Sequence, residues 1–305
     1  MGPIIQVRNL SKRFDDFLAV DHISFSVKRG ELFAFLGTNG AGKSTTINMI
    51  CTILTKTSGD IFVDGFEVAQ AGEQIRKKLG IVFQDNVLDN LLTVKENLTS
   101  RAAFIGLKGD RLTSRLTAIK TNLALQDIWH RPFGKLSGGQ KRKCEIARAI
   151  MSSPEILILD EPTTGLDPKT RQSIWQLIRH MQKHQGMTIF LTTHYMEEAA
   201  SADNVVILEK GSIKAEGTPA ELKRTYGKDN LKIRFKDDLL GQQQLAQLAI
   251  PLIKKADTYI VKIDENTKSL PILNSISDNL KDFELIKGSM DDVFLAVTDH
   301  SGVPK

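Results

Sequence analysis

The stretch Gly37-Thr-Asn-Gly-Ala-Gly-Lys43-Ser-Thr45 decides the fold of this chain of 305 residues. It matches the pattern G-x-x-x-x-G-K-[ST], whose glycines let successive backbone N–H groups converge on phosphate oxygens. An apolar run at 32–36 predicts a strand before the stretch, and residues 43–53 have the pattern of a helix after it. The N-terminus of a helix also favours an anion. The stretch therefore predicts a phosphate-binding loop in a nucleotide-binding α/β protein.

Every residue of this loop has an expected role. The expected ATP-binding residues are Gly37, Thr38, Asn39, Gly40, Ala41, Gly42, Lys43, Ser44 and Thr45. Among them, Lys43 should reach the β- and γ-phosphates and assist catalysis, and the Ser44 hydroxyl should bind Mg²⁺. The alternative is a glycine-rich turn with an accidental lysine, and the flanking strand and helix argue against it.

A second apolar run, at 156–159, ends in the carboxylates Asp160 and Glu161. In open α/β sheets, ligands bind at the carboxyl ends of the strands. We expect Asp160 to hold Mg²⁺ through its water shell and Glu161 to act as general base on the attacking water. The alternative is a core strand that ends in two solvated acids, and the phosphate-binding loop in the same chain makes that alternative weak.

Strand-like and helix-like stretches alternate before residue 227, which is typical of a largely parallel sheet covered by helices. The expected strands are 32–36, 80–83, 156–159, 188–192 and 205–208, and the expected helices are 43–53, 140–151 and 169–184. Residues 5–7 and 23–27 alternate apolar and polar side chains, which favours an antiparallel piece. The predicted first domain is 1–227, with a helical insertion at about 86–133.

A smaller α+β domain is predicted at 231–299, after the loop-type cluster 227–230. Its expected strands are 231–235, 259–263 and 283–286, and its expected helices are 239–249, 270–280 and 290–297. The expected fold class is therefore an α/β core with a mixed sheet and a helical subdomain, followed by a small α+β domain.

Composition excludes several other classes of protein. With 41% hydrophobic and 25% charged residues, usage is that of a globular protein. No apolar run approaches the ~18 to 20 residues that cross a bilayer, and the first residues lack a signal-peptide pattern, so a cytosolic chain is expected. Cys51 and Cys144 have no metal or disulfide spacing and are expected to be packing residues. The net charge of +5 would suit phosphates, an anionic membrane or nucleic acid, and does not choose between them.

A third motif, Leu136-Ser-Gly-Gly-Gln140, opens another predicted helix and provides a second helix terminus able to bind an anion. It resembles the signature of the ABC-type ATPases, and no other class of phosphate-loop protein is known by it. In that family, the signature of one copy closes over ATP held by another copy. The resemblance therefore implies that Ser137, Gly138, Gly139 and Gln140 bind ATP.

Four further residues resemble elements of the same family, in the same order along the chain. Gln84 resembles the Q-loop residue that touches Mg²⁺ or the attacking water, and His194 resembles the switch histidine that contacts the γ-phosphate. Asp167 resembles the D-loop residue at the dimer interface, and Phe14 stands where an aromatic ring stacks on adenine. Ordinary roles remain open: Gln84 as a loop residue, His194 as a structural histidine, and Asp167 as a helix cap. Phe17 could also exchange roles with Phe14.

The resemblance implies an ATP-binding and ATP-hydrolysing subunit that works as a homodimer with two shared sites. A separate permease would use the motion, with the helical insertion and Gln84 as its docking surface, and would hold the chain at the cytoplasmic face of the membrane. Residues 289–298, SMDDVFLAVT, resemble the closing motif of ATPases that serve ABC-2-type permeases, the group of daunorubicin-resistance and nodulation-factor exporters. The sequence therefore predicts an exporter ATPase.

Two alternatives from the same family remain. An importer ATPase would more often end in a β-rich barrel, whereas residues 231–299 alternate strands and helices. A soluble ABC ATPase acting on nucleic acid or the ribosome would usually carry a second ATPase domain, a long coiled coil or a zinc insertion. None of these is visible in the sequence, and no nucleic-acid partner is expected.

Overall fold

The computed structural model describes residues 2–248, 252–263 and 269–298. The chain divides into two compact units, which we call the core unit (Met1–Glu216) and the C-terminal unit (Gly217–Lys305). The sequence analysis places the boundary after 227, whereas the helix α8 (Pro219–Tyr226) groups with the C-terminal unit. We describe each unit by itself.

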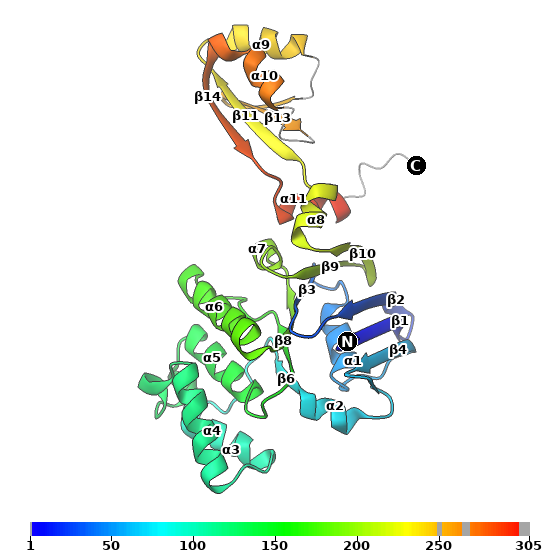
Figure 1. Ribbon diagram of the computed structural model, residues 1–305, viewed down its shortest axis with the longest axis vertical. Helices are drawn as coiled ribbons and strands as arrows, with labels where there is room; N and C mark the ends of the chain where they lie inside the picture. Colours follow the sequence, from blue (N-terminus) through cyan, green and yellow to red (C-terminus); the bar gives the residue numbers. More distant parts are fainter. Residues whose placement is uncertain (1, 249–251, 264–268, 299–305) are drawn as a thin grey trace. The chain divides into compact units, whose positions relative to one another are not determined.

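Two sheets form the core unit (Figure 1). The antiparallel sheet has the order β2–β1–β4–β5 and consists of β1 (Ile5–Phe14), β2 (Phe17–Val27), β4 (Ser58–Val63) and β5 (Phe66–Glu67). The larger sheet has the order β10–β9–β3–β8–β7–β6 and consists of β3 (Leu32–Gly37), β6 (Leu79–Val82), β7 (Ile156–Asp160), β8 (Thr188–Thr193), β9 (Asn204–Glu209) and β10 (Ser212–Gly217). Its strands β9, β3, β8, β7 and β6 run parallel, so their carboxyl ends share one edge.

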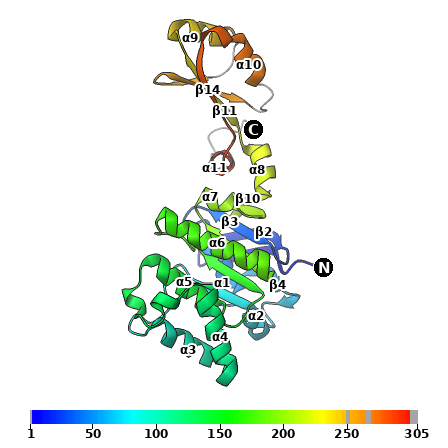
Figure 2. The same cartoon turned by 60° about the vertical axis from the view of Figure 1, so that its left-hand side comes forward.

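Seven α-helices accompany these sheets in the described part of the core unit. They are α1 (Lys43–Ile50), α2 (Gly72–Lys78), α3 (Val94–Phe104), α4 (Gly109–Asn122), α5 (Gly138–Ala149), α6 (Pro168–Gln185) and α7 (Met196–Ala199). Figures 1 and 2 both show α3, α4 and α5 gathered at one end of this unit, away from β1 and β2. Helices α3 and α4 fill the predicted helical insertion.

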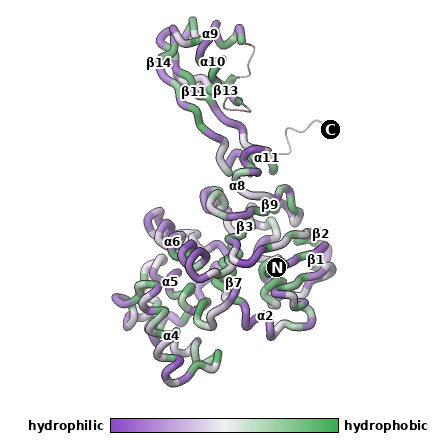
Figure 3. The backbone as a smooth tube through the Cα atoms, in the orientation of Figure 1, coloured by the Kyte–Doolittle hydropathy of each residue, from purple (hydrophilic) through white to green (hydrophobic). Residues whose placement is uncertain are grey.

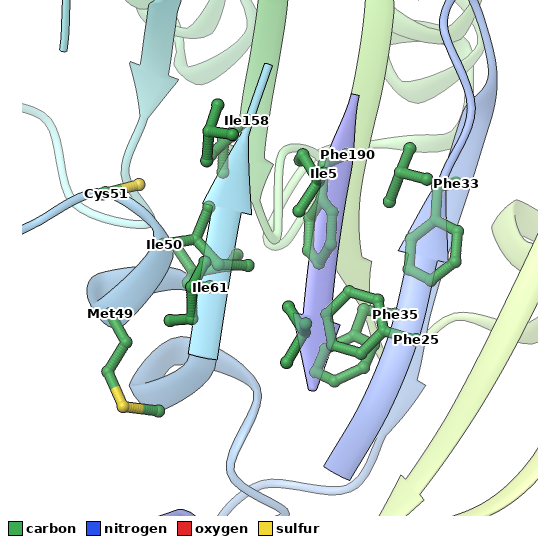
Figure 4. Close-up of a cluster of buried hydrophobic side chains, with 14 of the residues drawn as sticks. Ile5, Phe25, Phe33, Phe35, Met49, Ile50, Cys51, Ile61, Ile158 and Phe190 are labelled. Carbon is green, nitrogen blue, oxygen red and sulfur yellow. The ribbon is translucent and has the colours of Figure 1, made fainter. Parts of the chain in front are cut away.

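The main core lies between the antiparallel sheet and one face of the parallel sheet (Figure 4). Side chains alternate between the two faces of a strand, so Phe33 and Phe35 of β3 point to this side and the buried Leu36 points to the other. Phe33 and Phe35 pack with Phe25 and Phe190, with ring centroids 5.2 Å apart for Phe25 with Phe35 and for Phe33 with Phe190. Helix α1 packs on strands of both sheets. This packing fixes the loop that joins β3 to α1.

Helix α6 covers part of the opposite face and packs on β8. It is coloured mainly as hydrophilic in Figure 3, and the residues it buries include Ile174, Ile178 and Met181, spaced as an amphipathic helix requires. Asp167 caps its first turn, and Gly186 ends it with φ +64°, a left-handed conformation that glycine adopts without a steric penalty. Helix α6 is therefore defined at both ends by local sequence.

Both cysteines are packing residues, as the sequence predicts. Cys51 is 1% exposed and Cys144 is fully buried. Burial raises the pKa of the Cys144 thiol to about 12, and it also raises the pKa of the Cys51 thiol. Thiolates, not thiols, attack disulfide reagents.

We therefore expect the folded chain to show no fast reaction with an aromatic disulfide reagent at pH 8. The same chain in denaturant should release two equivalents of the chromophore, since the sequence contains 2 cysteines. Absorbance measurements with and without denaturant test this, and a rapidly reacting thiol in the folded chain would contradict the burial of these side chains.

The described part of the C-terminal unit contains a four-stranded antiparallel sheet and the two helices that connect its strands. The order along the chain is β11 (Asp229–Phe235), α9 (Asp238–Gln247), β12 (Leu252–Lys255), β13 (Thr258–Ile263), α10 (Ser269–Ser275) and β14 (Leu280–Ile286), and the strands lie in the order β12–β13–β11–β14. This βαββαβ arrangement is ferredoxin-like. A final helix, α11 (Met290–Thr298), packs against α8 within the same unit.

One predicted helix of this unit, 270–280, is wrong at its end. Helix α10 stops at Ser275, a single 3₁₀ turn follows, and β14 begins at Leu280. Leu280 pairs with Phe235 of β11, so ladder hydrogen bonds prevail over the local helical pattern. The last residue of the predicted helix 239–249 lies outside the described residues.

The structure has the predicted α/β core with its helical insertion, and a small α+β unit follows it. The strands β4, β5, β10 and β12 were not predicted from the sequence. Within the described ranges, no helix has both the length and the apolar composition needed to span a bilayer.

Candidate functional site

The phosphate-binding loop joins the carboxyl end of β3 to the first turn of α1. Gly40 and Gly42 have φ values of +80° and +102°, which side chains rarely adopt. A Cβ at Gly37 would lie 2.5 Å from the carbonyl oxygen of Leu208, so only glycine fits beside β9. The carbonyl of Ala41 accepts a hydrogen bond of 3.0 Å from the Gly211 N–H, which fastens the loop to the turn after β9.

Lys43 is the first residue of α1, and its side chain is only 5% exposed. Its Nζ donates to the carbonyl oxygens of Gly37, at 2.8 Å, and Thr38, at 3.1 Å. The same Nζ lies 3.6 Å from Oε1 of Glu161. Burial lowers the pKa of the Lys43 amine, and the charge of Glu161 opposes that shift. A buried cation therefore stands in the concave loop, where it can face an anionic ligand.

Ser44 and Asp160 meet beside this loop. The Ser44 hydroxyl lies 3.4 Å from Oδ1 of Asp160, which also accepts a hydrogen bond of 2.5 Å from the Thr192 hydroxyl. Asp160 ends β7 and Thr192 lies opposite it on β8, so adjacent parallel strands bring these groups together. A hydroxyl and a carboxylate are hard oxygen ligands of the kind that Mg²⁺ prefers.

Glu161 follows β7 and is held from several sides. It has φ +46°, an uncommon value for a residue with a side chain. Its N–H donates to the Thr192 hydroxyl at 3.0 Å, and its Oε2 accepts a hydrogen bond of 3.1 Å from the Thr164 hydroxyl. Nδ1 of His194 lies 3.2 Å from the same Oε2, although the two atoms are not aligned for a hydrogen bond. The fold thus places Lys43, Glu161 and His194 in one cluster.

The signature residues lie at the N-terminus of α5 and form a second group. Ser137 caps the helix: its hydroxyl accepts from the N–H of Gln140 at 3.4 Å, and Oε1 of Gln140 accepts from the N–H of Ser137 at 3.1 Å. A Cβ at Gly139 would lie 2.1 Å from the side chain of Thr170, and one at Gly138 would lie 3.2 Å from Leu166. The signature therefore packs against the start of α6.

Asp167 lies at this same place in the core unit. It is the N-cap of α6, and its carboxylate accepts from the N–H of Thr170 at 3.0 Å. Hydrogen bonds from Thr170 lower the pKa of the Asp167 carboxyl, so it stays charged near neutral pH. The cap alone accounts for an aspartate here, and the exposed carboxylate is also available to a neighbouring molecule.

Gln84 lies just after β6, in an exposed segment whose backbone is hydrogen-bonded to side chains of α5. The Arg142 guanidinium donates to the carbonyl oxygens of Phe83, at 2.6 Å, and Gln84, at 3.1 Å. Arg142 is 6% exposed. The backbone of Gln84 is thereby fixed to the helix that begins with the signature, and its side chain is left exposed to solvent.

Glu145, one turn further along α5, holds the other end of the same segment. Its Oε1 accepts from the N–H groups of Val87, at 2.7 Å, and Leu88, at 3.0 Å. Its Oε2 accepts from Nε of Arg148 at 2.8 Å, and Arg148 in turn donates to the carbonyl oxygen of Ile81 at 2.7 Å. We call Arg142, Glu145 and Arg148 the α5 clamp.

Phe14 and Phe17 face each other across the turn between β1 and β2. Phe14 is 42% exposed and Phe17 is 64% exposed, so both rings are accessible. Strand β2 then passes the phosphate-binding loop, because a Cβ at Gly42 would lie 2.6 Å from the carbonyl oxygen of Ala19. Either ring is available to a flat ligand near the loop, and the geometry does not separate the two.

Sequence reasoning missed the residues that hold the predicted ones in place. Thr192 was visible as part of the run before His194, but a threonine in a buried strand gives no signal of its partner. Glu145 is fully buried, yet a charged residue on a helix is ordinarily taken for part of a solvated face. Only its spacing of three residues from both Arg142 and Arg148, which places the three on neighbouring positions of one helix, could have indicated the α5 clamp.

Comparisons with known proteins agree with this geometry. Residues 20–164 match the family described as ABC transporter, and residues 217–298 match the C-terminal domain described as ATP-binding protein DrrA1-3-like. The daunorubicin/doxorubicin resistance ATP-binding protein DrrA of Streptomyces peucetius is 33% identical over 306 residues, which cover 97% of this chain and 92% of that protein. The Nod factor export ATP-binding protein I of Burkholderia orbicola is 37% identical, covering 80% of this chain and 81% of the relative.

A longer relative and two solved structures extend the comparison. A probable multidrug ABC transporter ATP-binding protein of Escherichia coli, YbhF, is 38% identical over 226 residues, 74% of this chain, and the match spans only 39% of its own length. The structure of CbiO1 from Clostridium perfringens, part of the ABC transporter complex cbiONQ, has a TM-score of 0.68 and 34% identity, covering 73% of this chain and 91% of that one. A dimeric ATP-binding cassette with bound ADP and Pi has a TM-score of 0.64 and 28% identity, covering 70% and 98%.

Proposed function

The chain belongs to the family of ABC transporter ATP-binding proteins, and we propose that it is the ATP-hydrolysing subunit of an ABC-2-type exporter. The predicted family and its ATPase core are confirmed by the relatives and by the solved cassettes. The observation that supports an exporter most is the C-terminal unit, which matches the DrrA-like domain over residues 217–298. Relatives that share it or most of the chain are named for drug resistance and for Nod factor export.

The cluster at the phosphate-binding loop has the groups that hydrolysis of ATP requires. We assign the phosphates to the loop backbone and to Lys43, since a buried ammonium that donates to two loop carbonyls gains from an anion. Glu161 is the base that takes the proton of the attacking water, and His194 holds the γ-phosphate beside it. Ser44 and Asp160 would hold Mg²⁺, with Gln84 as a further ligand expected from the sequence, and the ion would neutralise charge on the β- and γ-phosphates.

Two copies of the chain would complete each site. Ser137, Gly138, Gly139 and Gln140 belong to the N-terminus of α5, packed against α6 and apart from the hydrogen-bonded cluster at Lys43. The N-terminus of a helix favours an anion. Here the anion would come from ATP that is bound to a second copy of the chain. We propose that this helix terminus closes over ATP bound to the partner copy, giving a two-fold dimer with two ATP molecules, with Asp167 at the same interface. The solved cassette with ADP and Pi is a dimer.

The motion of the dimer must reach a separate permease, which would place the chain at the cytoplasmic face of the membrane. A cavity of about 1020 Å³ lies among α2, α3 and α4. Its lining includes the cations Arg76, Lys77, Arg101, Arg111 and Arg115, and the acids Glu73 and Asp110. Glu73 already pairs with Lys77 at 2.8 Å. The excess of cations favours an acid-bearing segment of the permease as the occupant.

Phe104 and Arg101 of α3 both line this cavity. Phe104, at the end of α3, is 86% exposed. Nε of Arg101, one turn earlier, is buried and has no hydrogen-bond partner among the described residues, and burial lowers the pKa of its guanidinium. The guanidinium of Arg101 is half-buried and carries further donors, so a carboxylate of the partner would accept a charge-assisted hydrogen bond from it. An apolar anchor beside such a donor is typical of an interface hot spot.

We expect a tagged Glu161→Gln chain with Mg-ATP to recover one polytopic membrane protein from membranes of the native source. Recovery should fall at least about tenfold for Phe104→Ser and for Arg101→Gln, since hot-spot truncations cost about 2 kcal/mol or more. Leu239→Ser is the matched control, because Leu239 is 74% exposed in the C-terminal unit, and it should recover the permease as before.

Mass spectrometry of the recovered proteins identifies the partner. Recovery of ribosomal proteins or nucleic acid, with no membrane protein, would contradict the transporter role and leave the ATPase assignment standing. Equal recovery of the permease with Phe104→Ser, Arg101→Gln and the control would contradict the docking surface alone.

A further inference from the structure

Glu198 is a buried carboxylate to which the proposed chemistry gives no role. It lies on the short helix α7 and is 3% exposed. Its two oxygens accept hydrogen bonds from two threonine hydroxyls: Oε1 from Thr163, and Oε2 from Thr193 at 2.5 Å. Both threonines are themselves buried, at 0% and 1% exposed. A buried charge with two directed donors is strongly held, because each bond is charge-assisted.

Each threonine belongs to a segment that carries one residue of the cluster. Thr163 lies in the turn after Glu161, beside Thr164, whose hydroxyl donates to Oε2 of Glu161. Thr193 ends β8 and directly precedes His194. Glu198 therefore joins the two strand ends that carry Glu161 and His194. The side chains of these two residues meet where Nδ1 of His194 lies 3.2 Å from Oε2 of Glu161.

Thr193 also connects Glu198 to His194 through the neighbouring residue Tyr195. The Thr193 hydroxyl, whose single proton points at Glu198, accepts a hydrogen bond of 2.9 Å from the N–H of Tyr195. The ring of Tyr195 lies 4.2 Å from that of His194, centroid to centroid, and the Arg171 guanidinium lies 4.2 Å from the centroid of the Tyr195 ring. Glu198 is thus linked to the imidazole of His194 through Thr193 and Tyr195.

We propose that Glu198 is a positioning residue for ATP hydrolysis, which sets the distance and orientation between Glu161 and His194 without touching ATP. The proposal concerns the hydrolysis step, and it does not depend on the permease or on the cargo. Loss of the carboxylate leaves two buried hydroxyl protons without acceptors, and the two strand ends become free to move. A misplacement of about 1 Å in a catalytic group can cost about 10²-fold in rate.

A purely structural role for Glu198 predicts something different. A buried carboxylate that only stabilises the fold would, once replaced, lower stability and affect binding and turnover together. A positioning residue affects turnover while ATP binding survives, because among the described residues the side chains of Glu198 and its two threonines form no hydrogen bond to the phosphate-binding loop. The split between KM and kcat therefore separates the two roles.

The experiment uses the full chain with Mg-ATP and follows steady-state ATP hydrolysis. In Glu198→Gln the side chain keeps its size but retains only one oxygen acceptor for the two hydroxyls. We expect kcat to fall about tenfold or more, with KM within about twofold. Thr193→Val and Thr163→Val delete one hydroxyl each at nearly constant volume, and each should lower kcat in the same way. Glu197→Gln is the matched control, since the neighbouring Glu197 is exposed, and it should turn over as the unaltered chain does.

A double-mutant cycle with His194→Ala completes the test. If Glu198 acts through His194, Glu198→Gln should cost much less in the His194→Ala background than in the unaltered chain. The proposal would be overturned by an unchanged kcat in Glu198→Gln. It would also be overturned if the losses in the double variant were fully additive and Thr193→Val turned over ATP as the unaltered chain does. A fall in kcat matched by an equal rise in KM would also overturn it.

Discussion

Replacing Glu161 by Gln should lower the rate of ATP hydrolysis by about 10² to 10⁴-fold, the contribution expected of a general base. The amide keeps the size of the carboxylate and can still accept the hydrogen bond of 3.1 Å from the Thr164 hydroxyl. It cannot take a proton from water. Because Lys43 keeps its two carbonyl partners in the phosphate-binding loop, ATP should bind with an affinity within a few fold of that of the unaltered chain. Single-turnover hydrolysis and calorimetric titration measure the two quantities separately.

The same variant should also accumulate as a dimer. If the signature of one copy closes over ATP of the other, a site that cannot hydrolyse stays closed, because the γ-phosphate maintains the contact. Light scattering at saturating Mg-ATP should then give twice the monomer mass, about 68 kDa from a chain of 33.9 kDa. The control is Glu197→Gln, which should hydrolyse ATP and return to the monomer. A monomer in the presence of ATP would contradict the shared site.

Local sequence was enough to locate the chemical groups. The phosphate-binding loop needs glycine at 40 and 42 because both have positive φ, and such a constraint is visible in the residues themselves. Asp160 and Glu161 follow a fully apolar strand, so their place at the carboxyl edge of the sheet follows from the run before them. The cap residues Ser137 and Asp167 were also visible, since helix N-termini have their own sequence pattern.

Tertiary contacts decide what local sequence did not predict. Strand β5 consists of 2 residues, and in β4 the apolar Phe62 lies on the same face as Ser58 and Asp60, so neither strand gives a clear alternation. Helix α10 ends early because β14 pairs with β11, a partner more than forty residues away in the chain. Glu145 and Glu198 are charged residues inside the core unit, and each accepts a hydrogen bond from a segment that is distant in the chain. Buried charges of this kind contradict the usual preference of charged side chains for the surface.

The α5 clamp leads to the largest expected loss of stability. Glu145→Ala would leave the N–H groups of Val87 and Leu88 without their acceptor and Arg148 without its buried counter-charge. Removing one partner of a buried ion pair costs about 3 to 5 kcal/mol, mainly because the other charge remains buried. Glu145→Gln should cost less than Glu145→Ala, because the amide oxygen can still accept from Val87 and Leu88. This order of the two variants distinguishes loss of the hydrogen bonds from loss of the charge.

Urea unfolding followed by tryptophan fluorescence measures this effect in the right part of the molecule, since both tryptophans, Trp129 and Trp175, lie in the core unit. Glu73→Ala is the control: Glu73 forms an exposed ion pair with Lys77 on α2, and exposed pairs add little to stability, so the midpoint should barely move. If Glu145→Ala and Glu73→Ala shifted the midpoint equally, the α5 clamp would not hold the segment after Gln84. If Glu145→Ala shifts it alone, the α5 clamp holds the segment after Gln84 against the helix that begins with the signature.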